Sequence, residues 1–134
     1  MPRAHAIGGA LALLAIVVLA IVIYVTLSHP KPTVLTVAMV DYRFQPDHLT
    51  FHHDVRYQLH LENHGLDTHE FTAPVFFASA DIENPEVLTR ERSEVVVQPG
   101  EAKDIILIAR KPGTYDLRCS DHDWNGMVGG ITVD

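Results

Sequence analysis

The sequence predicts an all-β domain, a sandwich of about eight short strands, preceded by one transmembrane helix. Two observations predict the sandwich: short segments of alternating apolar and polar residues, and clusters of Gly, Pro and Asn between them. Alternation with a period of two indicates strands with one buried face, and many short strands separated by turns are typical of an antiparallel sandwich. A third observation, an uncharged apolar run near the N-terminus, predicts the helix. The chain of 134 residues is long enough for one domain.

The apolar run covers residues 6–27, which contain no charged side chain. About 20 such residues span a bilayer as a helix, so we interpret residues 1–28 as a signal-anchor or transmembrane segment. A cleaved signal peptide is the alternative, because Arg3 precedes the run. The apolar part of such a peptide is only about 7–15 residues long, and no small-x-small cleavage site follows Leu27. Arg3 favours a cytoplasmic N-terminus, although Lys31 on the other side weakens this signal.

Residues 29–32 include two prolines and are predicted to be a short extended linker, so that residues 33–134 form the folded domain. The chain carries 10 Lys and Arg against 17 Asp and Glu, a formal net charge of −7. This acidic balance argues against nucleic acid as a partner. The single cysteine excludes an internal disulfide, and in an exported protein it requires another role, which metal binding supplies.

The first half of the domain contains four expected strands. They are rich in Val, Thr and Leu, and apolar residues alternate with polar ones most clearly in residues 55–62. A turn containing Pro46 follows the first strand, and Asn63-His64-Gly65 ends the third. In chain order these strands cover residues 33–40, 48–51, 55–62 and 68–72.

The second half begins with residues 73–92, where prolines and an acidic cluster predict a loop with at most one helical turn. Pro99-Gly100 fits the two central positions of a type II turn, and Pro112-Gly113 indicates another turn. Between and after these signals lie four more expected strands. They cover residues 94–97, 104–109, 114–119 and 127–133.

The candidate metal ligands are concentrated near the C-terminus, in the spacing Cys119-x2-His122-x4-Met127. A thiolate, an imidazole and a thioether together suit copper, whereas zinc rarely uses a thioether. Cys119 shares a strand face with apolar residues, so it should be buried. A trigonal copper site needs a second histidine, and the best candidate is His69, in the stretch from Asn63 to Phe71.

Each candidate also has a simpler interpretation. A buried cysteine is often an inert apolar group, and Met127 could serve only in packing. His64, in the turn, is the competitor of His69 as a ligand. Four more histidines of the domain are interpreted as surface residues: His48, His52, His53 and His60. The total of nine histidines in the chain nevertheless hints at a secondary role in copper capture.

Two motifs together resemble one protein family. Asn-x-Gly-x3-His-x-Phe spans residues 63–71, and Cys-x2-His-x4-Met spans residues 119–127. This pair looks like that of a cupredoxin, a blue type 1 copper protein, with the ligand spacing of plastocyanin and pseudoazurin. The resemblance covers residues 33–134 and implies Greek-key connectivity. It also implies one type 1 copper ion bound by His69, Cys119, His122 and Met127, in a domain on the periplasmic or extracytoplasmic side of the cytoplasmic membrane.

The sequence departs from this family at two places. Glu70 stands where such proteins often have Asn, and it could hydrogen-bond Ser120 or backbone amides and lower the reduction potential. Asp121 and Asp123 flank His122, and with Trp124 they predict an acidic and aromatic rim where the family is usually more apolar.

The resulting functional hypothesis is a membrane-anchored carrier of single electrons between membrane or periplasmic redox proteins. The alternative is a periplasmic copper-binding, delivery or copper-resistance protein, although the chain lacks a Met-rich capture motif. An enzyme is disfavoured because the paired His-x-His motifs of multicopper enzymes are missing. One cysteine also cannot build a dinuclear centre with two thiolates.

Overall fold

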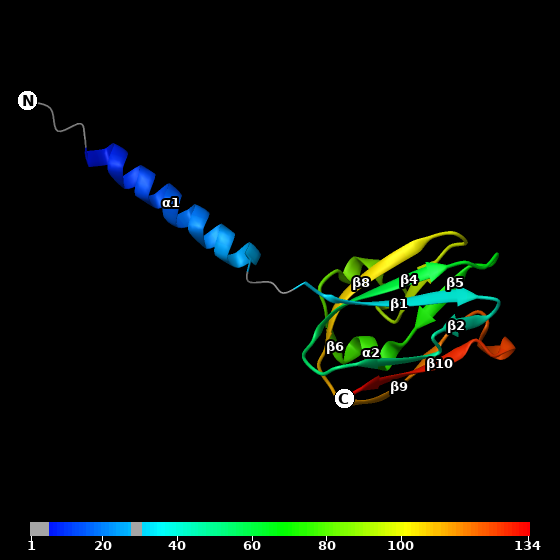
Figure 1. Ribbon diagram of the computed structural model, residues 1–134. Coiled ribbons are helices and arrows are strands. Elements are labelled where there is room, and N and C mark those ends of the chain that lie inside the picture. Colours follow the sequence, from blue (N-terminus) through cyan, green and yellow to red (C-terminus); the bar gives the residue numbers. More distant parts are fainter. Residues whose placement is uncertain (1–5, 28–30) are drawn as a thin grey trace, which may run out of the picture. The chain divides into compact units, whose positions relative to one another are not determined.

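The computed structural model describes residues 6–27 and 31–134. The chain divides into two compact units, residues 1–31 and residues 32–134. In the first unit, helix α1 (Ala6–Leu27) occupies the predicted apolar run, which is rich in the good helix formers Ala and Leu (Figure 1). Among the described residues, no helix satisfies both the length and the hydropathy needed for a membrane span, so the predicted transmembrane helix gains no support here. Half of the predicted linker, residues 29 and 30, lies outside the described residues.

The second unit is a sandwich of two five-stranded sheets. The first sheet has the order β2-β1-β4-β8-β6 and the second the order β3-β10-β9-β5-β7. The strands of the first sheet are β1 (Thr33–Val40), β2 (Arg43–Gln45), β4 (Arg56–Asn63), β6 (Ala80–Ile82) and β8 (Ala102–Ala109). Those of the second are β3 (His48–Phe51), β5 (His69–Thr72), β7 (Glu94–Val97), β9 (Gly113–Arg118) and β10 (Val128–Val133).

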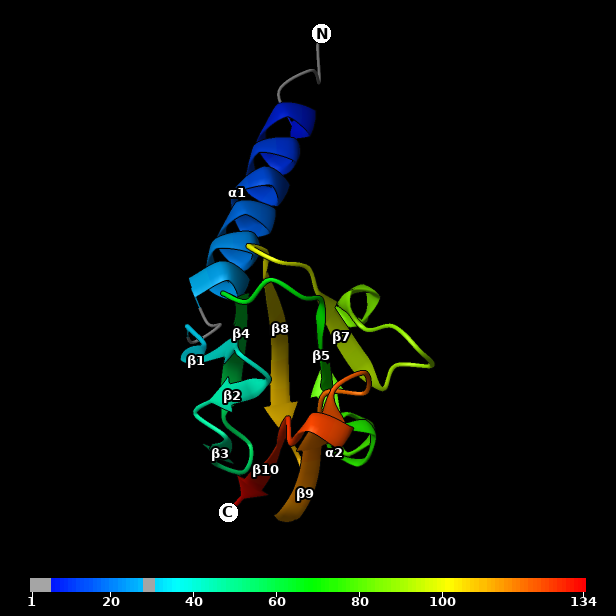
Figure 2. The ribbon, with the colours of Figure 1, turned by 90° about the vertical axis from the view of Figure 1, so that its right-hand side faces the viewer.

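The sandwich therefore has ten strands in its described residues, where the sequence predicted about eight. The two additional strands, β2 and β6, have three residues each and lie at the two edges of the first sheet, so they are too short to show an alternating pattern. The expected loop over residues 73–92 also contains helix α2 (Pro74–Ala78) and the 3-10 turn η1 (Pro85–Val87). Helix α2 packs against β6 and β9, and Figure 2 shows it beside β9.

The expectation of purely antiparallel pairing is wrong at two places, because β1 pairs with β4 in parallel and β3 pairs with β10 in parallel. After the β1–β2 hairpin the chain crosses to the second sheet as β3 and then returns as β4. This crossing brings β4 beside β1 in the same direction. Turn signals between neighbouring segments do not reveal such a crossing.

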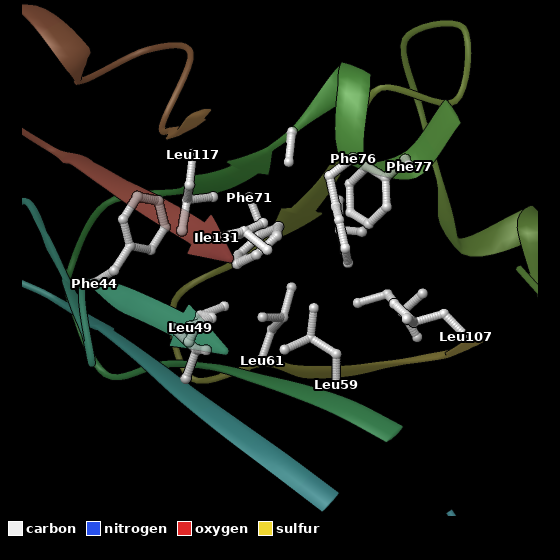
Figure 3. Packing of buried hydrophobic residues seen from close by; sticks show 14 of the residues in the cluster. Phe44, Leu49, Leu59, Leu61, Phe71, Phe76, Phe77, Leu107, Leu117 and Ile131 are labelled. Atoms are coloured by element: carbon white, nitrogen blue, oxygen red, sulfur yellow. The ribbon is translucent and has the colours of Figure 1, made fainter. Parts of the chain in front are cut away.

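The core lies between the two sheets, as Figure 3 shows. Leu59 and Leu61 of β4 project from the first sheet, while Phe71 of β5, Leu117 of β9 and Ile131 of β10 project from the second. Side chains two residues apart on a strand share a face. Phe71 and Leu117 are each two residues from a candidate ligand, so core packing fixes the backbone at His69 and Cys119.

Candidate metal centre

The loop between β9 and β10 carries three of the four candidate ligands. Arg118 pairs with Val128 at the ends of the two antiparallel strands, so the loop starts and finishes at adjacent points. The Cys119 amide donates to the Met127 carbonyl at 3.0 Å, and the His122 amide donates to the Cys119 carbonyl at 3.2 Å. The short 3-10 turn η2 (Asp123–Asn125) ends at Gly126, whose φ of 89° is in the left-handed region that glycine favours. The sequence spacing is thus folded into a closed loop.

Two imidazoles converge on the buried thiol. The Nδ1 atom of His122 lies 3.4 Å from Cys119 Sγ, and the Nδ1 atom of His69, at the start of β5, lies 3.9 Å from it. One ligand atom from each of these residues lies within 4.8 Å of the others. His64 does not join them: its Nε2 lies 2.9 Å from Glu62 Oε2, and its side chain is 58% exposed. This geometry favours His69 over His64.

Burial sets the protonation of these groups. Cys119 is fully buried and His69 is 1% exposed, whereas His122 is half-buried. Burial, together with a hydrogen bond to Glu70, raises the pKa of the Cys119 thiol to about 11. Burial and then the neighbouring His122 lower the pKa of His69. His69 therefore favours the neutral form, in which imidazole binds metals. A metal cation that binds Cys119 would have to displace the proton of its thiol.

The loop that leads to His69 is fixed by Asn63. Its buried side chain donates from Nδ2 to the carbonyls of Asp67 and Val97, both at 2.8 Å, and its Oδ1 accepts from the Gly65 amide at 2.9 Å. A Cβ atom at position 65 would lie 3.1 Å from His69 Nε2. Asn63 is therefore a positioning residue, whereas the sequence identified it only as part of a turn and of the motif over residues 63–71.

Glu70 lies in contact with the sulfur. Cys119 Sγ donates to Glu70 Oε2 at 3.0 Å, the Asp121 amide donates to the same oxygen at 3.3 Å, and the Glu70 amide donates to Cys119 Sγ at 3.4 Å. The predicted contact with a backbone amide is therefore confirmed. The alternative partner of Glu70, the Ser120 hydroxyl, donates to Glu94 Oε2 at 3.0 Å instead.

Glu94 is a second buried carboxylate that the sequence interpretation missed. It is 3% exposed, accepts a hydrogen bond from Thr72 Oγ1 at 3.1 Å, and lies 3.3 Å from Arg90 Nε. Glu94 pairs with Thr72 and lies on the opposite face of β7 from the core residues Val95 and Val97, so alternation along the strand gave no signal of its burial. A buried carboxylate is rare unless it has partners.

The rim of the site contains two aromatic side chains. Trp124 is 78% exposed and donates from Nε1 to the Asp121 carbonyl at 2.8 Å, so the acidic and aromatic character predicted for the rim is present. Tyr42, from the turn between β1 and β2, contacts the rings of both His69 and His122. This contact could not be predicted from the sequence, since the turn lies far from both histidines along the chain.

The donor set fits copper. The Cys119 thiol and two imidazole Nδ1 atoms from separate segments lie close together, and Met127 is fully buried in the same closed loop as Cys119. Copper is the metal that prefers two imidazoles, one thiolate and a weak axial thioether. The residues present are therefore compatible with one type 1 copper ion.

No curated protein sequence matches the chain. Among solved structures, the chain resembles dithionite-reduced auracyanin from the photosynthetic bacterium Roseiflexus castenholzii, with 17% identity, a TM-score of 0.59, and coverage of 78% of this chain and 99% of that one. It also resembles auracyanin B, with 18% identity, a TM-score of 0.60, and coverage of 79% and 92%. A reduced amicyanin variant has 15% identity, a TM-score of 0.50, and coverage of 80% and 87%. The profile of the cupredoxin-like domain matches residues 12–133, and the chain therefore belongs to the cupredoxin-like family.

Proposed function

We propose that this protein carries single electrons between redox partners, using one copper ion bound by His69, Cys119, His122 and Met127. The observation that carries the proposal is the convergence of two Nδ1 atoms on a buried thiol. A bound type 1 copper ion supplies a one-electron couple between its two oxidation states. Met127 enters the ligand set because it is buried and its backbone hydrogen-bonds to both Cys119 and His122.

The protein's own residues hold this centre in one arrangement. Cys119 and Met127 are joined by a backbone hydrogen bond at the ends of a paired hairpin, while His69 extends from β5 in the neighbouring part of the same sheet. Ligands fixed in this way move little when the charge of the centre changes. A carrier benefits from such rigidity, because electron transfer is fastest when few atoms have to rearrange.

Copper delivery is the second candidate, suggested by the additional histidines. The described histidines outside the centre lie against hydroxyl or carboxylate groups of the surface: His48 against Thr132, His52 against Asp134, His53 against Asp54, His60 against Asp104 and His64 against Glu62. These contacts are those of solvated surface residues. The burial of Cys119 and Met127 also opposes ligand exchange with a recipient protein. Both observations favour the carrier.

The experiment that tests the function is a visible spectrum of the full chain loaded with Cu(II). An intense charge-transfer band from the copper–thiolate bond should appear, bleach with ascorbate and return with a mild oxidant. Cys119→Ser should abolish the band, since a hydroxyl is not a soft ligand. Met127→Leu should keep it and raise the reduction potential. A colourless copper adduct of the wild type would refute the type 1 assignment.

His69→Ala and His64→Ala form a matched pair for the ligand assignment. The first should lose the band, because His69 Nδ1 faces Cys119 Sγ. The second should keep it, because His64 bonds Glu62 at the surface. The opposite result would show that the second imidazole comes from His64.

We further propose that residues 6–27 anchor the protein in the cytoplasmic membrane, with the copper domain on the extracytoplasmic side, where its partners would be membrane or periplasmic redox proteins. The support is the uncharged sequence of this segment, the position of Arg3 before it and the family resemblance. Membrane fractions washed with carbonate should retain the full chain. Release of a shortened, soluble protein would contradict the anchor.

A further inference from the structure

The turn between β1 and β2 holds a tyrosine where the backbone favours glycine. Val40 pairs with Arg43, so Asp41 and Tyr42 form a two-residue hairpin loop. Their φ angles are 48° and 61°, both in the left-handed region. A two-residue loop with both φ angles positive is a type I′ turn, for which Asn-Gly or Asp-Gly is the preferred sequence. Tyr42 thus occupies the glycine position, at a conformational cost.

The ring of Tyr42 contacts both imidazoles of the proposed copper site. Its centroid lies 4.9 Å from that of His122, with the planes inclined by 49°, and 6.0 Å from that of His69, edge to face at 87°. Aromatic rings at these separations attract each other, and the contact restricts the rotation of each imidazole. A histidine that rotates about its side-chain bonds would move its Nδ1 atom away from the sulfur.

The hydroxyl of Tyr42 fixes a third segment. It donates to Asp67 Oδ2 at 2.6 Å, and the Asp67 carbonyl in turn accepts from the buried Asn63 side chain at 2.8 Å. Asp67 lies two residues before His69. Tyr42 therefore connects the β1–β2 turn, the loop before β5 and the ligand loop after β9. The β1–β2 turn and the ligand loop lie at the same end of the sandwich in Figure 1.

We propose that Tyr42 is a positioning residue of the copper centre, whose ring holds the imidazoles of His69 and His122. Strained backbone persists where the surrounding structure requires it, and it is concentrated at functional sites. Here the strain and the contacts with the two histidines are independent observations at one residue. The inference rests on the proposed copper site and assigns a role to a residue outside the ligand motifs.

The test uses three full-length variants. Tyr42→Gly removes the ring and relieves the backbone, Tyr42→Asn removes the ring but tolerates a positive φ, and Tyr42→Phe keeps the ring and loses the hydroxyl. The apoprotein of the Gly and Asn variants should melt at the wild-type temperature or above it. Bicinchoninate should nevertheless remove their Cu(I) more readily, with an affinity about 10- to 100-fold below that of the wild type, as for other residues that orient metal ligands. Their electron self-exchange should also slow, while Tyr42→Phe should stay near the wild type in self-exchange.

A second measurement is independent of copper. In the NMR spectrum of the apoprotein, ring currents from Tyr42 should shift the imidazole protons of His69 and His122, and these shifts should be lost in the Gly and Asn variants but kept in Tyr42→Phe. The proposal would be overturned if both variants without the ring released copper as the wild type does. It would also be overturned if both lost much of their apoprotein stability, because Tyr42 would then be a folding residue. A wild type without the blue band would instead refute the copper function, and the proton shifts would still report whether Tyr42 fixes the imidazoles.

Discussion

Replacing Glu70 with Gln should raise the reduction potential of the copper centre. The Glu70 side chain is buried, and its Oε2 atom lies 3.0 Å from Cys119 Sγ and 3.3 Å from the Asp121 amide nitrogen. Reduction adds an electron to the metal and its ligands. A carboxylate beside the sulfur opposes this added negative charge, so its removal should stabilise the reduced state.

The size of the effect follows from this distance. Two unit charges 3.0 Å apart interact by about 5 kcal/mol at an effective dielectric constant of about 20. Only part of the added electron resides on the sulfur, and the rest lies farther from Glu70, so we take about 1 to 2.5 kcal/mol as the difference between the two oxidation states. For a one-electron couple this corresponds to a rise of about 50–100 mV.

Cyclic voltammetry of the copper-loaded wild type and variant measures this shift directly. Glu94→Gln is a matched control, because Glu94 is equally buried but bonds Ser120 and Thr72 and has Arg90 as a counter-charge. Its shift should be clearly smaller. A potential that does not change in Glu70→Gln, or one that changes equally in both variants, would show that no negative charge beside the sulfur tunes the centre.

Two further predictions concern other parts of the domain. Gly65→Ala should destabilise the protein by about 1–3 kcal/mol and alter the visible spectrum, because the new Cβ would lie 3.1 Å from His69 Nε2. Chemical denaturation measures the first effect and visible absorption the second. An unchanged spectrum would contradict the close contact. His60 has its pKa raised by Asp104 and then by Glu62, so its contribution to stability is present below its ordinary pKa and is lost as the pH rises through the folded-state pKa. Urea unfolding between about pH 5 and pH 9 should show a decline in the wild type of at most about 1 kcal/mol, which His60→Gln should remove; parallel profiles for the two proteins would refute the assignment.

The sequence was sufficient to predict the strands in which apolar and polar residues alternate over many positions. Strand β4 alternates strictly between half-buried and buried residues, and a strand over residues 55–62 was predicted from that alternation. The edge strands β2 and β6 were not predicted, because three residues are too few to define a period. The parallel pairing of β1 with β4 was not predicted for another reason. It depends on which sheet β3 joins, and contacts between residues distant in sequence determine that sheet.

In the metal site, too, local patterns were predictable from the sequence and contacts between distant segments were not. The spacing of Cys119 and His122 is local, and their side chains lie 3.4 Å apart. His69 was found only through its motif, and its approach to the sulfur depends on the pairing of β5 with β9. Tyr42 and Glu94 were missed, because their roles depend on side chains brought together from segments distant along the chain.

The two buried carboxylates have different electrostatic surroundings, which separates their roles. Glu94 has a cationic neighbour in Arg90 and two hydroxyl donors, so its charge is compensated within the protein. The hydrogen bonds of Glu70 at Oε2 come from the Asp121 amide and the Cys119 thiol, and the thiol is also a proposed ligand. A buried negative charge without a cationic partner is costly, and a metal cation bound to Cys119 would supply that partner. The carboxylate therefore couples the stability of this end of the sandwich to the occupancy and charge of the copper site.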